Sequence, residues 1–194
     1  MNGMFDEAIT RAFPPAIRRI FEDQLCFGFV FGGFGKGYGG PGHDIDMFVA
    51  VNQLAAGAQA EFVSWYMAFH QELRLPPDLE YPGELVLLGD LERRIRFLEA
   101  SHIRPVIESQ YEYESILWVD ALSEEKLAFV SGPGIDMGQL EQLMKRAYSL
   151  MLKWRSEVIL WRPEPLSDLK KLDLRRLFKG HVSYLKRQSL PPGA

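Results

Sequence analysis

A glycine-rich segment between two short apolar runs sets the strongest limit on how this chain folds. Residues 32–42 read GGFGKGYGGPG and hold seven glycines and one proline. This composition predicts a loop, because glycine and proline both interrupt regular structure. Residues 25–31 and 45–51 on either side are apolar and include several aromatic or branched side chains, which is typical of buried strands. The sequence therefore predicts a strand, a glycine loop and a second strand.

The remaining pattern predicts an α+β protein. We expect a helix over 5–23, broken or kinked near Pro14 and Pro15. Further expected elements are a helix over 54–74, a strand over 84–88, a helix from Asp90 to about 100, a hairpin of 111–120 with 126–131, a helix over 136–161 and a basic helix over 168–187. This order indicates a small mixed β-sheet with flanking helices. We expect one domain over 1–130 and a helical C-terminal part over 131–194.

Composition excludes several classes of protein. Hydrophobic residues make up 47% of the 194, which fits a buried core rather than disorder. No stretch approaches the roughly 18 apolar residues of a membrane span. Asp6 and Glu7 stand where a signal peptide carries positive charge, and Cys26 is the single cysteine. We therefore expect a cytoplasmic protein with no membrane partner.

Three interpretations of the glycine segment have to be separated. A P-loop needs Gly-x4-Gly-Lys-Ser/Thr, but Val30 stands at the first glycine position and Gly37 at the hydroxyl position. Gly35, Gly37 and Gly40 match the dinucleotide pattern G-x-G-x-x-G. That motif requires a helix directly after the glycines, whereas Pro41 and a strand follow here. The third interpretation takes the loop together with the acidic residues behind it.

Asp44 and Asp46 open the second predicted strand and are separated by one apolar residue. Alternate strand residues share a face, so the two carboxylates point the same way, about 7 Å apart along the chain. They repel each other unless a cation lies between them, and magnesium prefers such oxygen ligands. A glycine turn beside them can offer backbone N–H groups to phosphate oxygens. The pattern therefore indicates phosphoryl chemistry with magnesium.

The sequence FGG, followed after ten residues by DID, resembles the signature of the polymerase-β nucleotidyltransferase superfamily, especially its minimal and antibiotic-modifying members. Gly33 stands where serine is common in bacterial members, and His43 stands where serine commonly precedes the aspartates. The resemblance implies that Asp44 and Asp46 hold two magnesium ions. It also implies that the backbone of Gly32 and Gly33 approaches the nucleotide phosphates.

Lys36 has two interpretations, a phosphate contact or a solvated loop lysine. The superfamily also implies a third carboxylate on a following strand, for which Glu84 is our prediction and Glu80 the rival. Glu84 would complete a metal shell or accept a proton.

The implied reaction transfers a nucleotide monophosphate from a nucleoside triphosphate, with ATP the expected donor, to a hydroxyl of a small molecule, protein or RNA. The alternative is a protein that keeps this fold without catalysis and binds nucleotide or a partner, as in a toxin–antitoxin pair. The resemblance leaves the acceptor and the oligomeric state open.

Basic residues gather near the end of the chain. Residues 170–187 carry a net charge of +6 in a protein whose net charge is −4. Such a helix can be a solvated face, or it can contact nucleotide phosphates or nucleic acid. Within it, Arg176 to His181 resembles the Arg-x4-His ribonuclease motif of HEPN domains.

Overall fold

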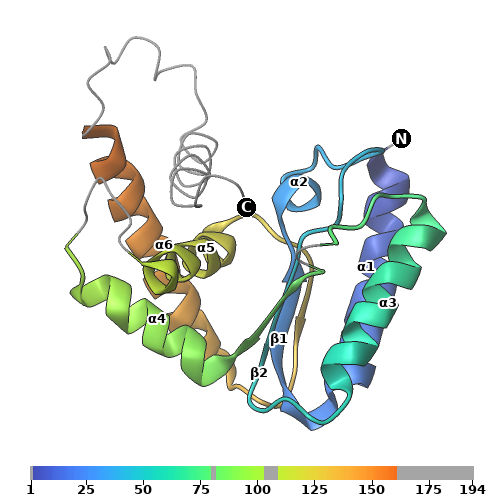
Figure 1. Ribbon diagram of the computed structural model, residues 1–194, viewed down its shortest axis with the longest axis horizontal. Coiled ribbons are helices and arrows are strands. Elements are labelled where there is room, and N and C mark those ends of the chain that lie inside the picture. The colour runs from blue at the N-terminus through green and yellow to red at the C-terminus, as the bar shows by residue number, and fades with distance from the viewer. Residues whose placement is uncertain (1, 80–81, 103–108, 161–194) are drawn as a thin grey trace, which may run out of the picture.

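The computed structural model describes residues 2–79, 82–102 and 109–160 (Figure 1). Its elements in chain order are α1 (Asn2–Phe21), the 3-10 turn η1 (Glu22–Gln24), β1 (Leu25–Val30), α2 (Gly32–Gly35), β2 (Met47–Val51), α3 (Ala58–Leu73), β3 (Glu84–Leu87), α4 (Leu88–Ala100), α5 (Gln110–Ser123), β4 (Leu127–Ser131) and α6 (Met137–Leu160). The protein is α+β with a small sheet and flanking helices, which confirms the predicted fold class. No helix in these ranges is long and apolar enough to cross a membrane.

The sheet has the strand order β3-β2-β1-β4. Strand β1 pairs antiparallel with both β2 and β4, and β2 pairs parallel with β3, so the sheet is mixed as predicted. These directions bring the last residue of β1 and the first residues of β2, β3 and β4 to one end of the sheet. We call this the acidic end, because Asp44, Asp46, Glu84 and Glu124 lie there. We call the other end of the sheet the opposite end.

Helices α1 and α3 cover one face of the sheet (Figure 1). Ile9, Phe13 and Ile17 are spaced by four residues along α1 and are fully buried in the core on this face. Of the expected break or kink near Pro14 and Pro15, the break is wrong, because helix α1 runs unbroken through both prolines. Proline inside a helix costs about 3 kcal/mol. Helix α1 holds two prolines, so the cost is roughly 6 kcal/mol. Burying the six large apolar side chains of α1 contributes more, roughly 1.5–3 kcal/mol each.

Helices α4, α5 and α6 cover the other face (Figure 1). The strands present an aromatic stack to this layer, in which Phe29 lies 5.2 Å from Phe48 and 6.3 Å from Phe27 between ring centroids. Phe129 of β4 stacks on the same rings at 6.4–6.5 Å. Helix α6 packs against α5 and α4 and closes this core with Trp154, which is 2% exposed.

The predicted hairpin of 111–120 with 126–131 is wrong in its first half. Residues 110–123 form α5, and β4 pairs with β1 instead. The Ser109 hydroxyl caps α5 by accepting the backbone N–H of Glu112 at 3.1 Å. Ser115, Ile116 and Val119 are fully buried, so the apolar stripe has helical spacing rather than strand alternation.

Two smaller predictions also change. Gly32–Gly35, expected as loop, forms the single helical turn α2. Helix α4 begins at Leu88, so Asp90 lies inside its first turn and pairs with Arg93 rather than capping the helix. The predicted basic helix over 168–187 and its Arg176–His181 motif lie outside the described residues.

Candidate functional site at the acidic end of the sheet

The topology brings the predicted site residues to one end of the sheet. The glycine turn follows β1, Asp44 and Asp46 directly precede β2, and Glu84 is the first residue of β3. The expected strand began two residues earlier, but a bond from the Phe31 N–H to the Asp46 carbonyl, 3.0 Å, continues the pairing of β1 with β2. Asp46 therefore continues the pairing of β1 with β2, and Asp44 lies two residues before it, outside the strand.

Gly32 and Asp46 form the tightest contact of the site. Gly32 has φ of +63°, a left-handed conformation that side chains rarely adopt. A Cβ atom at Gly32 would overlap the Asp46 carboxylate and lie 2.6 Å from its Cγ. At Gly33 a Cβ would make ordinary contacts, 3.5 Å to Tyr38 and 3.6 Å to His43. Glycine is therefore required at position 32, by both conformation and space, and is not required at position 33.

His70 fixes the backbone between the two aspartates. Its Nε2 accepts the Ile45 N–H at 2.9 Å, and its Nδ1 lies 2.9 Å from the Tyr66 carbonyl. A ring that accepts at Nε2 carries its proton on Nδ1, which then donates to that carbonyl. The ring is fully buried, and burial lowers its pKa below the ordinary 6.5, against the opposing effects of the Tyr66 carbonyl and the Asp44 charge. His70 is therefore a neutral clamp on the Asp44–Asp46 segment.

Sequence reasoning did not find this clamp. His70 lies on the buried side of the predicted helix, four residues after Tyr66 and next to Phe69. A histidine among core aromatic residues was the available signal, although the sequence could not show that it reaches a segment 25 positions away.

Tyr66 lies beside the same segment. Its hydroxyl accepts the Asp78 N–H at 3.0 Å, and its ring centroid lies 4.0 Å from that of His70. Burial raises the pKa of Tyr66, and the negative charges of Asp44, Asp78 and Asp46 raise it further. The hydroxyl therefore stays protonated.

Lys36 and the Gly32 N–H both bind one buried carboxylate. The Lys36 ammonium lies 3.2 Å from Oε1 of Glu124, and the Gly32 N–H donates to Oε2 at 3.3 Å. The Glu124 side chain is 0% exposed and that of Lys36 is 11% exposed. The two groups expected at the nucleotide phosphates thus tie the glycine turn to the junction of α5 and β4. Nothing in the sequence indicated this contact, because 92 positions separate Gly32 from Glu124.

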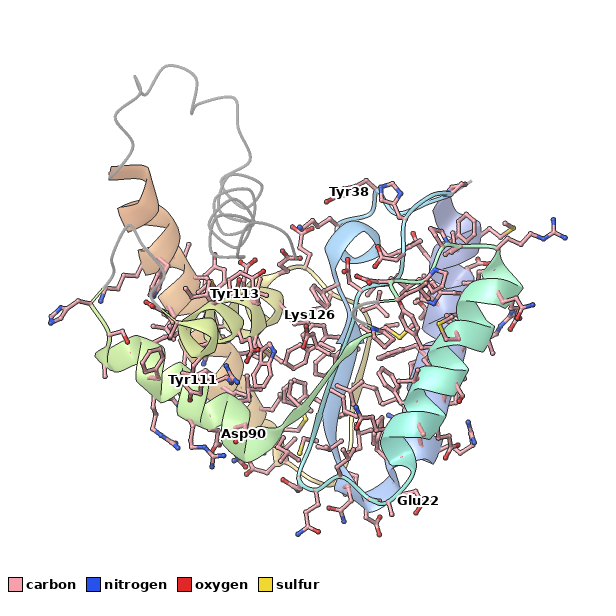
Figure 2. All side chains as sticks on the ribbon, in the orientation of Figure 1. Glu22, Tyr38, Asp90, Tyr111, Tyr113 and Lys126 are labelled. Atoms are coloured by element: carbon pink, nitrogen blue, oxygen red, sulfur yellow. The ribbon has the colours of Figure 1, made fainter. Side chains whose placement is uncertain are left out.

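The junction itself is fixed by Lys126. Its ammonium donates to the carbonyls of Leu122 and Glu124, each at 2.7 Å, and lies 4.9 Å from the centroid of the Phe29 ring. Figure 2 shows Lys126 between α5 and the sheet. The segment that contains Glu124, whose carboxylate holds the glycine turn, is therefore itself fixed in position.

Glu84 faces the same side of the sheet as Asp46. It stands opposite Phe48 in the parallel register, and Phe48 is two residues from Asp46. Its carboxylate accepts the indole N–H of Trp118 at 3.1 Å. Within 2–79, 82–102 and 109–160, no three His, Cys, Asp or Glu side chains are grouped so that they could hold a metal ion. The three predicted carboxylates thus lie at one end of the sheet, and no three-ligand cluster forms among the described residues. Glu80, the rival, lies outside the described residues.

Comparison of the chain with protein-family models, with curated proteins and with solved structures found no match in any of the three.

Proposed function

We propose that this protein is a magnesium-dependent nucleotidyltransferase. It would transfer a nucleotide monophosphate from a nucleoside triphosphate, with ATP the expected donor, to a hydroxyl of a small molecule, a protein or RNA. The observation that carries the proposal is the contact between the Asp46 carboxylate and the backbone of Gly32. It makes the glycine turn and the aspartate pair one structural unit, as phosphate binding beside a metal requires.

The side chains at the acidic end fit magnesium in their chemistry. Asp44 and Asp46 are half-buried carboxylates, and Glu84 on the neighbouring strand has the same oxygen donors. Magnesium prefers hard oxygen ligands and is commonly held by one or two carboxylates together with substrate phosphates. When bound, it would supply charge neutralisation at the phosphates and a lower pKa for the acceptor hydroxyl.

The residues of the chain have separate tasks in this proposal. His70 holds the Ile45 N–H and so fixes the backbone between the two aspartates. Gly32 allows close approach beside Asp46, where no side chain can intervene. Glu84 would complete the metal shell or accept the proton of the acceptor hydroxyl. The common result is a rigid frame that positions phosphate and acceptor.

A second candidate is a protein of the same architecture that binds a nucleotide or a partner, such as the other half of a toxin–antitoxin pair, without turnover. The contacts of Glu124 favour it, because this carboxylate engages Lys36 and the Gly32 N–H, both expected at the phosphates. The substitution Asp46→Asn distinguishes the two candidates by its effect on turnover. The substitution abolishes turnover in an enzyme, whereas a binder has no turnover to lose.

Calorimetric titration with a non-hydrolysable ATP analogue, with and without magnesium, tests the proposal. Binding should require magnesium and should weaken at least about 100-fold in Asp44→Asn/Asp46→Asn, since a buried charge–metal contact is lost. Asp23→Asn is the matched control, because this exposed aspartate lies in η1 at the opposite end. Magnesium-independent binding, or equal loss in the control, would contradict the metal site. Absence of any binding would contradict the proposed function.

A further inference from the structure

Trp118 contacts the predicted third carboxylate directly. Its indole N–H donates to Oε2 of Glu84 at 3.1 Å, from a helix 34 positions later in the chain. Indole nitrogen is a donor only and has a single hydrogen, so this bond fixes both the ring and the carboxylate that accepts it. Trp118 thereby links α5 to the first residue of β3.

Behind Trp118 lies an arginine held between two aromatic rings. The Arg94 guanidinium carbon lies 4.1 Å from the centroid of the Trp118 ring and 4.3 Å from that of Tyr111. Its nitrogens also donate to the Tyr111 carbonyl at 3.0 Å and to the Glu114 carboxylate at 2.9 Å. Arg94 is 12% exposed in its side chain, so α4 and α5 together enclose it. A guanidinium stacked in this way is fixed in orientation.

These contacts connect Arg94 through Trp118 to Glu84 at the acidic end. The Arg94 guanidinium also donates to the Ser115 hydroxyl at 3.3 Å, so contacts with three residues of α5 besides Trp118 fix its position. Trp118 lies against Arg94, and Glu84 accepts from Trp118. A cation over the ring face withdraws electron density, which strengthens the indole N–H as a donor. Outer contacts that orient a metal-binding carboxylate commonly change metal affinity by about 10–100-fold.

We infer that Trp118 is a positioning residue for Glu84 and that Arg94 supports it. This inference rests on the proposed function, because it assigns Glu84 the place of third metal ligand. It predicts that the indole N–H, rather than the bulk of the ring, is what the site requires. A purely structural tie between α4, α5 and β3 would need only the ring, which phenylalanine also supplies in part.

A double-mutant cycle on Mn²⁺ affinity tests the inference, with Mn²⁺ replacing magnesium as a spectroscopic probe. Binding is measured in the full chain with a non-hydrolysable ATP analogue present, and thermal unfolding is followed in parallel. The variants are Trp118→Phe, Glu84→Gln and both together. Trp65→Phe is the matched control, since Trp65 stacks on Phe69 within the layer on the other face of the sheet.

Trp118→Phe should weaken Mn²⁺ binding about tenfold. In the Glu84→Gln background the same change should have no further effect, because the carboxylate through which Trp118 acts is gone. Arg94→Gln should weaken binding about threefold, again only when Glu84 is present. If Trp118→Phe does not fold, the Mn²⁺ affinity of Arg94→Gln tests the positioning role instead.

Mn²⁺ binding that is unchanged in Trp118→Phe, or weakened equally with and without Glu84, would overturn the positioning role and leave the metal site standing. Wild-type protein that binds no Mn²⁺ would overturn the proposed function and this inference together.

Discussion

The two ends of the sheet both depend on close approach to glycine, but they bring different groups together. At the opposite end, Gly132 and Gly134 lie against Leu25, and Cβ atoms there would lie 2.7 Å from its Cβ and its carbonyl oxygen respectively. At the acidic end, Gly32 lies against the carboxylate of Asp46. In Figure 2, Glu22 marks the opposite end and Tyr38 the acidic end.

The difference predicts how substitutions at the two ends should act. Contacts at the opposite end are apolar contacts or hydrogen bonds between uncharged groups, such as the Gly134 N–H to the Leu25 carbonyl at 2.8 Å. At the acidic end, carboxylates approach backbone groups, which costs free energy unless cations or donors compensate. Substitutions at the opposite end should therefore affect mainly stability. At the acidic end, some substitutions should change stability and others should change nucleotide or metal binding.

The largest effect on stability is expected at the buried ion pair of Lys36 and Glu124. Lys36→Met removes the cation from a carboxylate that is 0% exposed, and such a loss costs about 3–5 kcal/mol. Urea unfolding measures the change in free energy. Arg19→Met is the control, because Arg19 and Glu61 are 62% and 47% exposed and their pair contributes at most about 1 kcal/mol. Unchanged stability with weaker nucleotide binding would instead make Lys36 a phosphate contact.

Alanine at two glycines compares the ends directly. Gly132→Ala forces the new Cβ against Leu25 and its carbonyl, so we expect about 2–3 kcal/mol of destabilisation and unchanged nucleotide affinity. Gly32→Ala meets only a side-chain carboxylate and a left-handed φ, which costs about 1–2 kcal/mol. It should nevertheless abolish metal-dependent binding, because Asp46 is displaced. Equal effects of the two changes on binding would contradict the division between the ends.

The histidine clamp predicts a pH dependence. The pKa of His70 is lowered in the folded protein, so below the ordinary 6.5 the unfolded chain binds more protons than the folded one. The free energy of unfolding should then fall as pH drops from 6.5 towards the folded pKa, by at most about 1.4 kcal/mol per pH unit. His70→Gln should remove this part of the slope in urea unfolding between pH 5 and pH 7. An unchanged slope would show that other groups carry it.

The smallest effect is expected at Asn52. Its side-chain amide donates to the Gly134 carbonyl at 2.7 Å at the opposite end. Asn52→Ala should cost about 1 kcal/mol, the usual net contribution of one hydrogen bond. Thermal unfolding measures this loss, and the affinity for the ATP analogue should not change. A change in affinity would mean that the two ends are coupled through β2.

The sequence predicted the parts whose signal is local. The apolar runs gave β1 and β2, and the aromatic stripe of residues 54–74 gave α3, in which Phe62 and Tyr66 are buried. The shared face of Asp44 and Asp46 stays a prediction, because both residues lie before β2. In contrast, the segment from Tyr111 onwards alternates aromatic and acidic residues like a strand, but it forms α5 because its buried positions recur with helical spacing.

The contacts that support the candidate site could not be predicted, because they join distant parts of the chain. His70 reaches Ile45, Glu124 reaches Gly32, and Trp118 reaches Glu84. Each of these contacts depends on how a helix packs on the sheet, and the spacing of residues along the sequence does not indicate that packing. Pro14 and Pro15 wrongly predicted a break because burial, too, depends on distant parts of the chain. The free energy gained by burying the apolar face of α1 exceeds the local cost of the two prolines.

The contact between Glu124 and the glycine turn also has a consequence for the order of assembly. The strands β1 and β2 are neighbours in sequence and can pair soon after synthesis, whereas the carboxylate that holds Gly32 comes 92 positions later. Long-range contacts form late, because the chain must first close a large loop. During synthesis the glycine turn therefore stays unclamped until α5 has docked. We therefore expect the site to reach its final geometry only after α5 has been synthesised and has docked.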